Sequence, residues 1–166
     1  MNSTELDWES SEEVTQPGGN VKTRGARVII ADDDESMRCL LTLALVTEGY
    51  DVGVATTGTE TLRMLQSILL DAWPLDGVDL LVLDVRMPGL TGIEILRQLR
   101  AQHWTTPIII MTAFADADIV AEAGRYGTSV LSKPFSLDEL TSRVAAELVA
   151  HQRALGLAPA RARLTS

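Results

Sequence analysis

Two patterns of apolar residues alternate five times along the chain. Short apolar runs are typical of buried strands, and stretches with apolar residues every three or four positions are typical of amphipathic helices. The predicted strands are Arg27–Ala31, Asp51–Ala55, Val78–Leu83, Pro107–Met111 and Thr128–Leu131. The predicted helices span about Glu35–Glu48, Gly92–Gln102, Asp116–Tyr126 and Ser136–Gln152, and one further helix begins after Gly58 or Thr59 and carries apolar residues as far as Leu69. Strands and helices that alternate with short connections predict an α/β fold, a doubly wound parallel sheet with helices on both faces.

Polar residues and glycines mark the ends of several of these helices. Asp34 precedes the first helix and is expected to cap it, and Gly49 stops it. The second helix is expected to take Gly58 or Thr59 as its cap. The segment that opens with Ser136 has glutamate three positions later, which predicts a capping box at the start of the last helix.

The composition divides the 166 residues into three parts. Residues 1–25 are acidic and polar and contain a Pro-Gly-Gly turn, which predicts a disordered arm. Residues 26–152 carry the alternating pattern and form the predicted domain. Residues 153–166 are basic and rich in alanine, and we expect a flexible tail with no output domain.

The charge balance argues against nucleic acid as a direct partner. The chain has a formal net charge of −9, and residues 27–150 hold 18 acidic against nine basic residues. Binding to phosphate backbones needs clusters of lysine and arginine, so no direct contact with nucleic acid is expected. Aromatic residues make up 4% of the chain against 46% apolar residues, so the core is expected to be aliphatic.

The remaining composition excludes several other kinds of site. Cys39 is the single cysteine, so no disulfide forms within the chain, and it is expected to be a small buried side chain. His103 and His151 have no partners at metal-binding spacing and receive no role. No apolar run approaches the roughly 20 residues that span a bilayer, which predicts a cytoplasmic protein without a membrane segment.

Carboxylates and a lysine follow three of the predicted strands. Asp32, Asp33 and Asp34 follow the first strand, Asp84 follows the third, and Lys133 follows the fifth. In an open parallel sheet, ligands bind beyond the carboxyl ends of the strands. Carboxylates and a lysine gathered at that edge can hold a divalent cation and accept a phosphoryl group.

Four motifs at these strand ends, in this order, closely resemble the receiver domain of two-component response regulators, and the resemblance covers about residues 27–150. The motifs are Ile29-Ile30-Ala31-Asp32-Asp33-Asp34, Leu83-Asp84-Val85-Arg86-Met87-Pro88-Gly89, Ile110-Met111-Thr112-Ala113 and Leu131-Ser132-Lys133-Pro134-Phe135. The resemblance implies a flavodoxin-like five-stranded sheet of order 2-1-3-4-5 with five helices.

The resemblance also implies a phosphoacceptor and a bound Mg²⁺. Asp84 would take a phosphoryl group from the phosphohistidine of a sensor histidine kinase or of a histidine phosphotransfer protein. Asp33 and Asp84 would bind the Mg²⁺ directly, Asp32 would reach it through water, and the backbone carbonyl of Arg86 would supply another oxygen. Asp34 occupies a variable acidic position of the family, in agreement with the capping role.

Further residues would respond to the phosphoryl group. The ammonium group of Lys133 would pair with one phosphoryl oxygen, and the hydroxyl of Thr112 would donate a hydrogen bond to another. The peptide bond between Lys133 and Pro134 would be cis. An aromatic residue of the fifth strand usually moves inward in this family, but that position here is Val130, a side chain stiff at its first torsion. The fourth helix, fifth strand and fifth helix would signal to an unknown downstream protein or form a homodimer.

Two other functions stay open from the sequence. A pseudo-receiver would bind partners without being phosphorylated, and the departure at Val130 leaves room for it. A phosphatase with an aspartate nucleophile also uses Mg²⁺ and a lysine, but it needs a second acid where this chain has Arg86. For the receiver, we expect no enzyme activity beyond assistance to its own phosphoryl transfer and dephosphorylation.

Overall fold

The computed structural model describes residues 25–71, 77–113 and 117–157. The predicted acidic arm and most of the predicted tail lie outside the described residues. The strands are β1 (Arg27–Ala31), β2 (Asp51–Ala55), β3 (Leu80–Asp84), β4 (Ile108–Thr112) and β5 (Ser129–Ser132). The helices are α1 (Glu35–Thr47), α2 (Gly58–Asp71), α3 (Gly92–Ala101), α4 (Ala117–Arg125) and α5 (Leu137–Ala154). The predicted order of elements is confirmed.

The five strands form one parallel sheet in the order β2-β1-β3-β4-β5, as the resemblance implied. The register places Ala31 of β1 beside Leu83 of β3, and Thr112 of β4 beside Ser132 of β5. The carboxyl ends of β1, β3, β4 and β5 therefore meet along one edge of the sheet. Every polar residue at or just after a strand end is brought to that edge.

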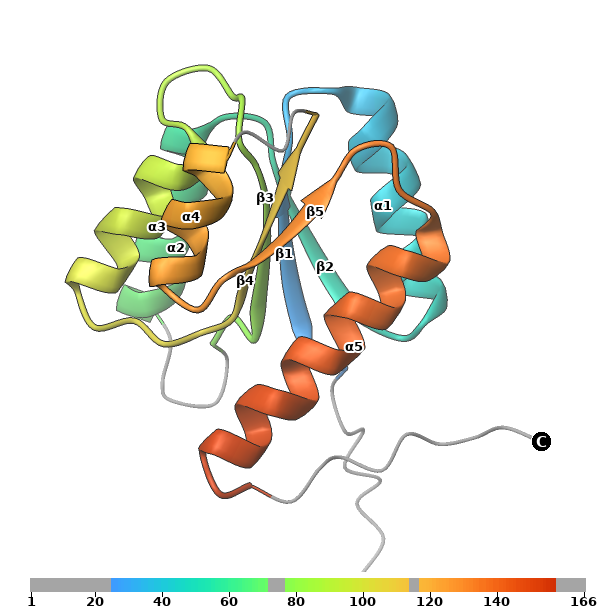
Figure 1. Ribbon diagram of the computed structural model, residues 1–166. Coiled ribbons are helices and arrows are strands. Elements are labelled where there is room, and N and C mark those ends of the chain that lie inside the picture. Colours follow the sequence, from blue (N-terminus) through green and yellow to red (C-terminus); the bar gives the residue numbers. More distant parts are fainter. Residues whose placement is uncertain (1–24, 72–76, 114–116, 158–166) are drawn as a thin grey trace, which may run out of the picture.

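Helices cover both faces of the sheet, with α1 and α5 on one face and α2, α3 and α4 on the other (Figure 1). Alternate residues of β1 point to opposite faces, so Ile29 packs beneath α2 and α3 while Ile30 packs beneath α1 and α5. All residues of β3 and β4 are buried, as expected of strands covered on both sides. Both cores are mainly aliphatic, and each fully buried Ile or Leu contributes about 1.5–3 kcal/mol.

The predicted caps of α1 and α5 are confirmed, and the predicted cap of α2 is wrong. Asp34 Oδ1 accepts a hydrogen bond from the Met37 N–H at 2.9 Å, which confirms the predicted cap of α1. Helix α2 begins at Gly58, and Thr57 acts as its cap because its Oγ1 accepts from the Glu60 N–H at 3.1 Å. Ser136 Oγ accepts from the Glu139 N–H at 3.1 Å, which is one half of the predicted capping box.

The buried position predicted for Cys39 is wrong, because the side chain is exposed on α1. Leu40 is also exposed, at 47%, whereas Leu41 and Leu45 are fully buried. Successive residues of a helix are turned by about 100°, so the stripe that faces the sheet includes Leu41 and leaves its two predecessors outside.

A complete capping box begins α3. Thr91 Oγ1 accepts from the Glu94 N–H at 3.2 Å, and Glu94 Oε2 accepts from the Thr91 N–H at 2.8 Å. Hydrogen bonds from the backbone and side chain of Thr91 lower the pKa of Glu94. A lowered native pKa means that the contribution of Glu94 to stability is present above its unfolded-state pKa and is lost as the pH falls through the native value.

We predict that Thr91→Ala lowers the free energy of unfolding by about 1 kcal/mol at neutral pH. The deficit should narrow as the pH falls through the lowered native pKa of Glu94, because the protonated side chain no longer accepts these hydrogen bonds as a carboxylate. Urea denaturation at neutral and at acidic pH measures the difference. Thr47→Ala, which removes an exposed hydroxyl within α1, is the control and should change stability less. A deficit that does not depend on pH would contradict the role given to Glu94.

Candidate functional site

Polar residues from four strand ends converge at the carboxyl edge of the sheet. Asp32 directly follows β1, Asp84 is the last residue of β3, Thr112 is the last residue of β4, and Lys133 directly follows β5. The predicted third strand ended one residue earlier, so Asp84 belongs to the strand itself. Its backbone is therefore fixed by the sheet and not by the following loop.

Lys133 bridges two buried carboxylates. Its Nζ donates to Asp32 Oδ2 at 2.8 Å and to Asp84 Oδ1 at 2.9 Å. Asp32 and Asp84 are only 1% and 6% exposed. Burial of an ionised carboxylate is costly unless it is paired, and the ammonium provides that partner for both.

Each of the two carboxylates is also held through its second oxygen. Asp32 Oδ1 accepts from the Asp34 N–H at 2.9 Å, and Asp84 Oδ2 accepts from the Arg86 N–H at 3.0 Å. Arg38 adds a contact from α1, because its Nη1 donates to the backbone carbonyl of Asp32 at 2.8 Å. The two acids therefore have fixed orientations before any ligand binds.

Three carboxylates can offer oxygens to one cation at this site. One oxygen each from Asp32, Asp33 and Asp84 lies within 4.8 Å of the others, and Asp33 is exposed whereas the other two are buried. Carboxylate oxygens are the ligands that Mg²⁺ prefers, usually together with several waters. The donor set therefore fits a hard divalent cation that solvent reaches from the Asp33 side.

The electrostatics of Asp84 reflect two opposing effects. Burial raises the pKa of Asp84, and the nearby charge of Asp32 raises it further, while the hydrogen bond and charge of Lys133 act in the opposite direction. For Lys133, burial acts to lower the pKa, but the hydrogen bonds to Asp32 and Asp84 outweigh it and the pKa is raised. Lys133 therefore stays cationic. A second positive charge near Asp84 would favour the ionised form of the Asp84 carboxyl group.

Gly92, the first residue of α3, lies too close to the backbone of Asp84 to carry a side chain. A Cβ built at Gly92 would lie 2.5 Å from the backbone carbonyl oxygen of Asp84, and the Gly92 N–H donates to the Val85 carbonyl at 3.2 Å. The start of α3 thus lies directly against the backbone of Asp84.

We predict that Gly92→Ala costs about 1–3 kcal/mol in the free energy of unfolding, because the added methyl must displace backbone. Urea denaturation measures the change. Gly124→Ala is the matched control, since a Cβ on Gly124 of α4 meets nothing within 4 Å. That variant should be neutral or stabilised by about 0.5–1 kcal/mol. Equal effects of the two substitutions would contradict the close contact at Asp84.

The other predicted residues are placed at the same edge, although their roles stay predictions. The Lys133 N–H donates to the Thr112 carbonyl at 2.7 Å, and Thr112 is 4% exposed. The bond between Lys133 and Pro134 is cis, as the resemblance implied. Arg86 contacts Asp84 through its N–H, and the ligand role predicted for its carbonyl oxygen stays untested. The contact of Arg38 with the backbone of Asp32 was not predicted from the sequence. Its position, one turn into the helix that follows Asp32, is the signal that could have indicated it.

An open parallel sheet carries a lysine-bridged acidic cluster at its carboxyl edge, the edge at which ligands bind in sheets of this class. The sequence profile of the response regulator receiver domain matches residues 28–145. The chain belongs to this family, whose members act in two-component systems. The match favours the receiver over the pseudo-receiver and the phosphatase considered above.

Relatives and solved structures agree with this assignment. The chain is 39% identical over 123 residues to the response regulator MprA of Mycobacterium avium, covering 74% of this chain and 50% of that protein. It is 34% identical over 115 residues to the regulatory protein AtoC of Escherichia coli, covering 69% of this chain and 23% of that protein. The chain therefore spans half or less of the length of these relatives.

A solved structure of a Francisella response regulator receiver domain, 1452, superposes with a TM-score of 0.67 at 32% identity. The alignment covers 76% of this chain and 99% of that one, so the receiver fold accounts for nearly all of that domain. Among the described residues of the present chain, no helix has both the length and the apolar character needed to cross a membrane.

Proposed function

We propose that this chain receives a phosphoryl group on Asp84 from a phosphohistidine, with Mg²⁺ as cofactor. The observation that carries the proposal is the convergence of Asp84, Asp32 and Asp33 with the Nζ of Lys133, 2.9 Å from Asp84 Oδ1. Capping or solvent exposure can account for each residue alone, but not for one partly buried lysine held between two buried acids. The proposal rests on that geometry together with membership of the receiver family.

The chemistry that these residues support is a direct displacement at phosphorus. An oxygen of Asp84 attacks phosphorus, the bond from phosphorus to the imidazole nitrogen breaks, and the departing imidazole takes up a proton. A carboxylate needs no base to become a nucleophile. The Arg86 N–H holds Asp84 Oδ2, which leaves Oδ1 toward Lys133 as the oxygen placed to attack.

Asp32, Asp33 and Asp84 would hold the Mg²⁺, which would offset the repulsion between the incoming phosphoryl oxygens and the acids. Lys133 would exchange its bond to Asp84 for one to a phosphoryl oxygen, where negative charge accumulates. Thr112 would donate its hydroxyl to another. The chain would thus assist its own phosphorylation and dephosphorylation without turning over other substrates.

The output surface would be formed by α4, β5 and α5. A new phosphoryl group adds about two negative charges at Asp84 and would draw Thr112 toward it. Val130 is half-buried and packs with Ile119 against the core beneath α4. We propose that the movement reaches α4 through this aliphatic contact, because no aromatic side chain stands at that position of β5.

The proposed partners are a sensor histidine kinase or a histidine phosphotransfer protein upstream and a further protein downstream. Val120 and Tyr126 are 43% and 38% exposed on and next to α4, so the same surface could also bind a second copy. The absence of direct contact with nucleic acid and the cytoplasmic location stay predictions. Gel-shift assays and cell fractionation test them.

The proposal is tested with acetyl phosphate, a small phosphoryl donor. The protein is incubated with acetyl phosphate in Mg²⁺ or in excess EDTA, and its intact mass is recorded. We expect a gain of one phosphoryl group, about 80 Da, that depends on Mg²⁺. No adduct in Mg²⁺ would favour the pseudo-receiver, and steady hydrolysis of small phosphomonoesters would favour the phosphatase.

A further inference from the structure

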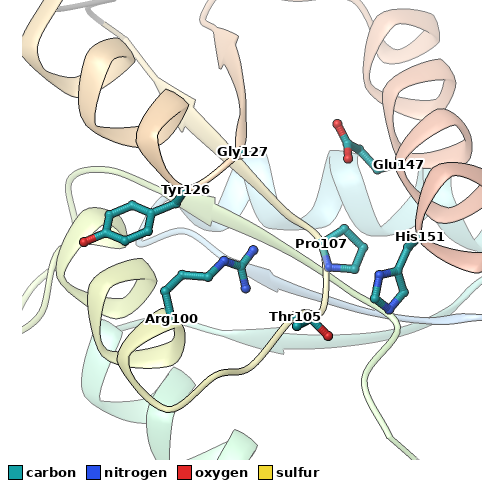
Figure 2. Close-up of a pocket in the computed structure, with 7 residues that line it drawn as sticks. All are labelled: Arg100, Thr105, Pro107, Tyr126, Gly127, Glu147 and His151. Carbon is teal, nitrogen blue, oxygen red and sulfur yellow. The ribbon is translucent and has the colours of Figure 1, made fainter. Parts of the chain in front are cut away.

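A polar cavity lies at the edge of the sheet opposite Asp84. It has a volume of about 370 Å³ and is lined by residues of α3 and α5 and of the loops that precede β4 and β5 (Figure 2). Pro107 precedes β4 and Gly127 precedes β5, so the cavity adjoins the amino ends of these strands. It is therefore separate from the acidic cluster, and neither the family match nor the proposed function gives it a role.

Arg100 is the distinctive side chain of this cavity. It extends from α3 between Tyr126 and Pro107 (Figure 2). Its Nη1 donates to the Trp104 carbonyl and its Nη2 donates to the Thr106 carbonyl at 3.1 Å. These bonds fix the plane of the guanidinium and use two of its five N–H donors.

Arg100 has no acidic partner in the part of the chain that the structure describes. Burial lowers the pKa of Arg100, and no charge from a described carboxylate opposes that effect. By contrast, Arg97 pairs with Glu122, and Lys133 pairs with two aspartates. A half-buried cation without a counter-ion is unusual where acids outnumber bases by 18 to nine in residues 27–150.

The opposite wall of the cavity belongs to α5, from which Glu147 and His151 project (Figure 2). The carboxylate of Glu147 is already engaged, because Ser129 Oγ donates to its Oε1. It is held against β5 and forms no ion pair with Arg100. The imidazole of His151 lines the same cavity and can donate an N–H to a ligand there.

We propose that this cavity binds a small anion with a carboxylate or phosphate group, held by Arg100 and contacted by His151. The planar fork of a guanidinium matches two oxygens of either group. The volume is within the range of pockets that bind small molecules, about 300–1,000 Å³. Glu147 restricts the anionic group to the Arg100 side, because its carboxylate repels an oxyanion placed near β5.

The test is a titration of the full chain followed by amide chemical shifts, with inorganic phosphate in one series and succinate in another. Excess EDTA keeps divalent cations away from Asp84, and KCl at matched ionic strength is the reference. We expect saturable shifts in residues 100–107 and 126–128 with at least one anion. The series that saturates identifies the phosphate or the carboxylate as the preferred group.

Three variants connect the binding to the proposed residues. Arg100→Gln should weaken binding by about ten- to a hundredfold, and His151→Ala by about fivefold. Arg97→Gln, on the same helix but outside the cavity, should leave binding unchanged. Because Arg100 also holds two carbonyls of its loop, His151→Ala provides a second variant that does not disturb them.

Shifts no larger than those in KCl would overturn the proposal. Binding that survives both Arg100→Gln and His151→Ala would also overturn it. Neither result depends on phosphorylation of Asp84, so failure here is distinguishable from failure of the proposed function.

Discussion

Asp84→Asn is expected to abolish the phosphoryl adduct that the wild-type protein forms with acetyl phosphate and Mg²⁺. The amide keeps the size of the side chain and can still accept the hydrogen bond from the Arg86 N–H. It loses the negative charge that makes the oxygen a nucleophile and a good cation ligand. Intact mass spectrometry measures the adduct, and the expected yield is nil.

The matched control is Asp138→Asn, which removes an exposed acid from the first turn of α5. It changes the net charge equally but lies outside the acidic cluster, so its adduct should match that of the wild type. Circular dichroism establishes that both variants are folded. An adduct of equal yield on Asp84→Asn would place the phosphoacceptor elsewhere, with exposed Asp33 the first residue to test.

The convergence at Asp84 could be predicted because it depends only on topology. In a parallel sheet, every residue at a strand's carboxyl end reaches the same edge, so Asp32, Asp84 and Lys133 had to lie at one edge once their strands were identified. The pairing of Lys133 with both aspartates could not be predicted. It depends on the conformation of the loop after β5, which begins at Lys133.

Local errors arose where several sequence signals compete. Thr57, Gly58 and Thr59 are all good residues at a helix start, and only the structure shows that the Thr57 hydroxyl accepts the bond from the Glu60 N–H. Cys39 is common in cores by residue type, but its direction on α1 is decided by which stripe faces the sheet. Residue preference alone gives neither answer.

The cavity around Arg100 has no sequence signature. Its lining residues come from α3, two loops and α5, and the feature that distinguishes Arg100 is its lack of a described carboxylate partner. Such an uncompensated charge becomes visible only when neighbouring side chains are placed. The residues of the acidic cluster are brought together by the register of the strands, but the residues of this cavity are not. The apolar pattern of the sequence therefore does not predict that they lie together.

Lys133→Met is expected to lower the free energy of unfolding by about 2–3 kcal/mol in EDTA, because it leaves two buried carboxylates without their cation. The loss on removing one partner of a buried pair is about 3–5 kcal/mol, and the 19% exposure of the lysine side chain places this case below that range. Urea denaturation measures it. Arg97→Met, which breaks the exposed pair with Glu122, is the control and should have little effect.

The pH dependence of this deficit tests its electrostatic origin. The pKa of Lys133 is raised in the folded protein, so its contribution to folding stability is fully present below the ordinary lysine pKa of 10.5. That contribution is lost only as the pH rises through the native pKa of Lys133. The ion pairs of the wild-type lysine are therefore intact at neutral pH. Burial raises the pKa of Asp84, so protonation of this acid stabilises the folded state as the pH falls through its native pKa. The deficit of Lys133→Met should therefore shrink toward acidic pH, and also on addition of Mg²⁺, which places positive charge beside the same carboxylates. A deficit unchanged by both would mean that the lysine stabilises the protein through packing of its aliphatic stem.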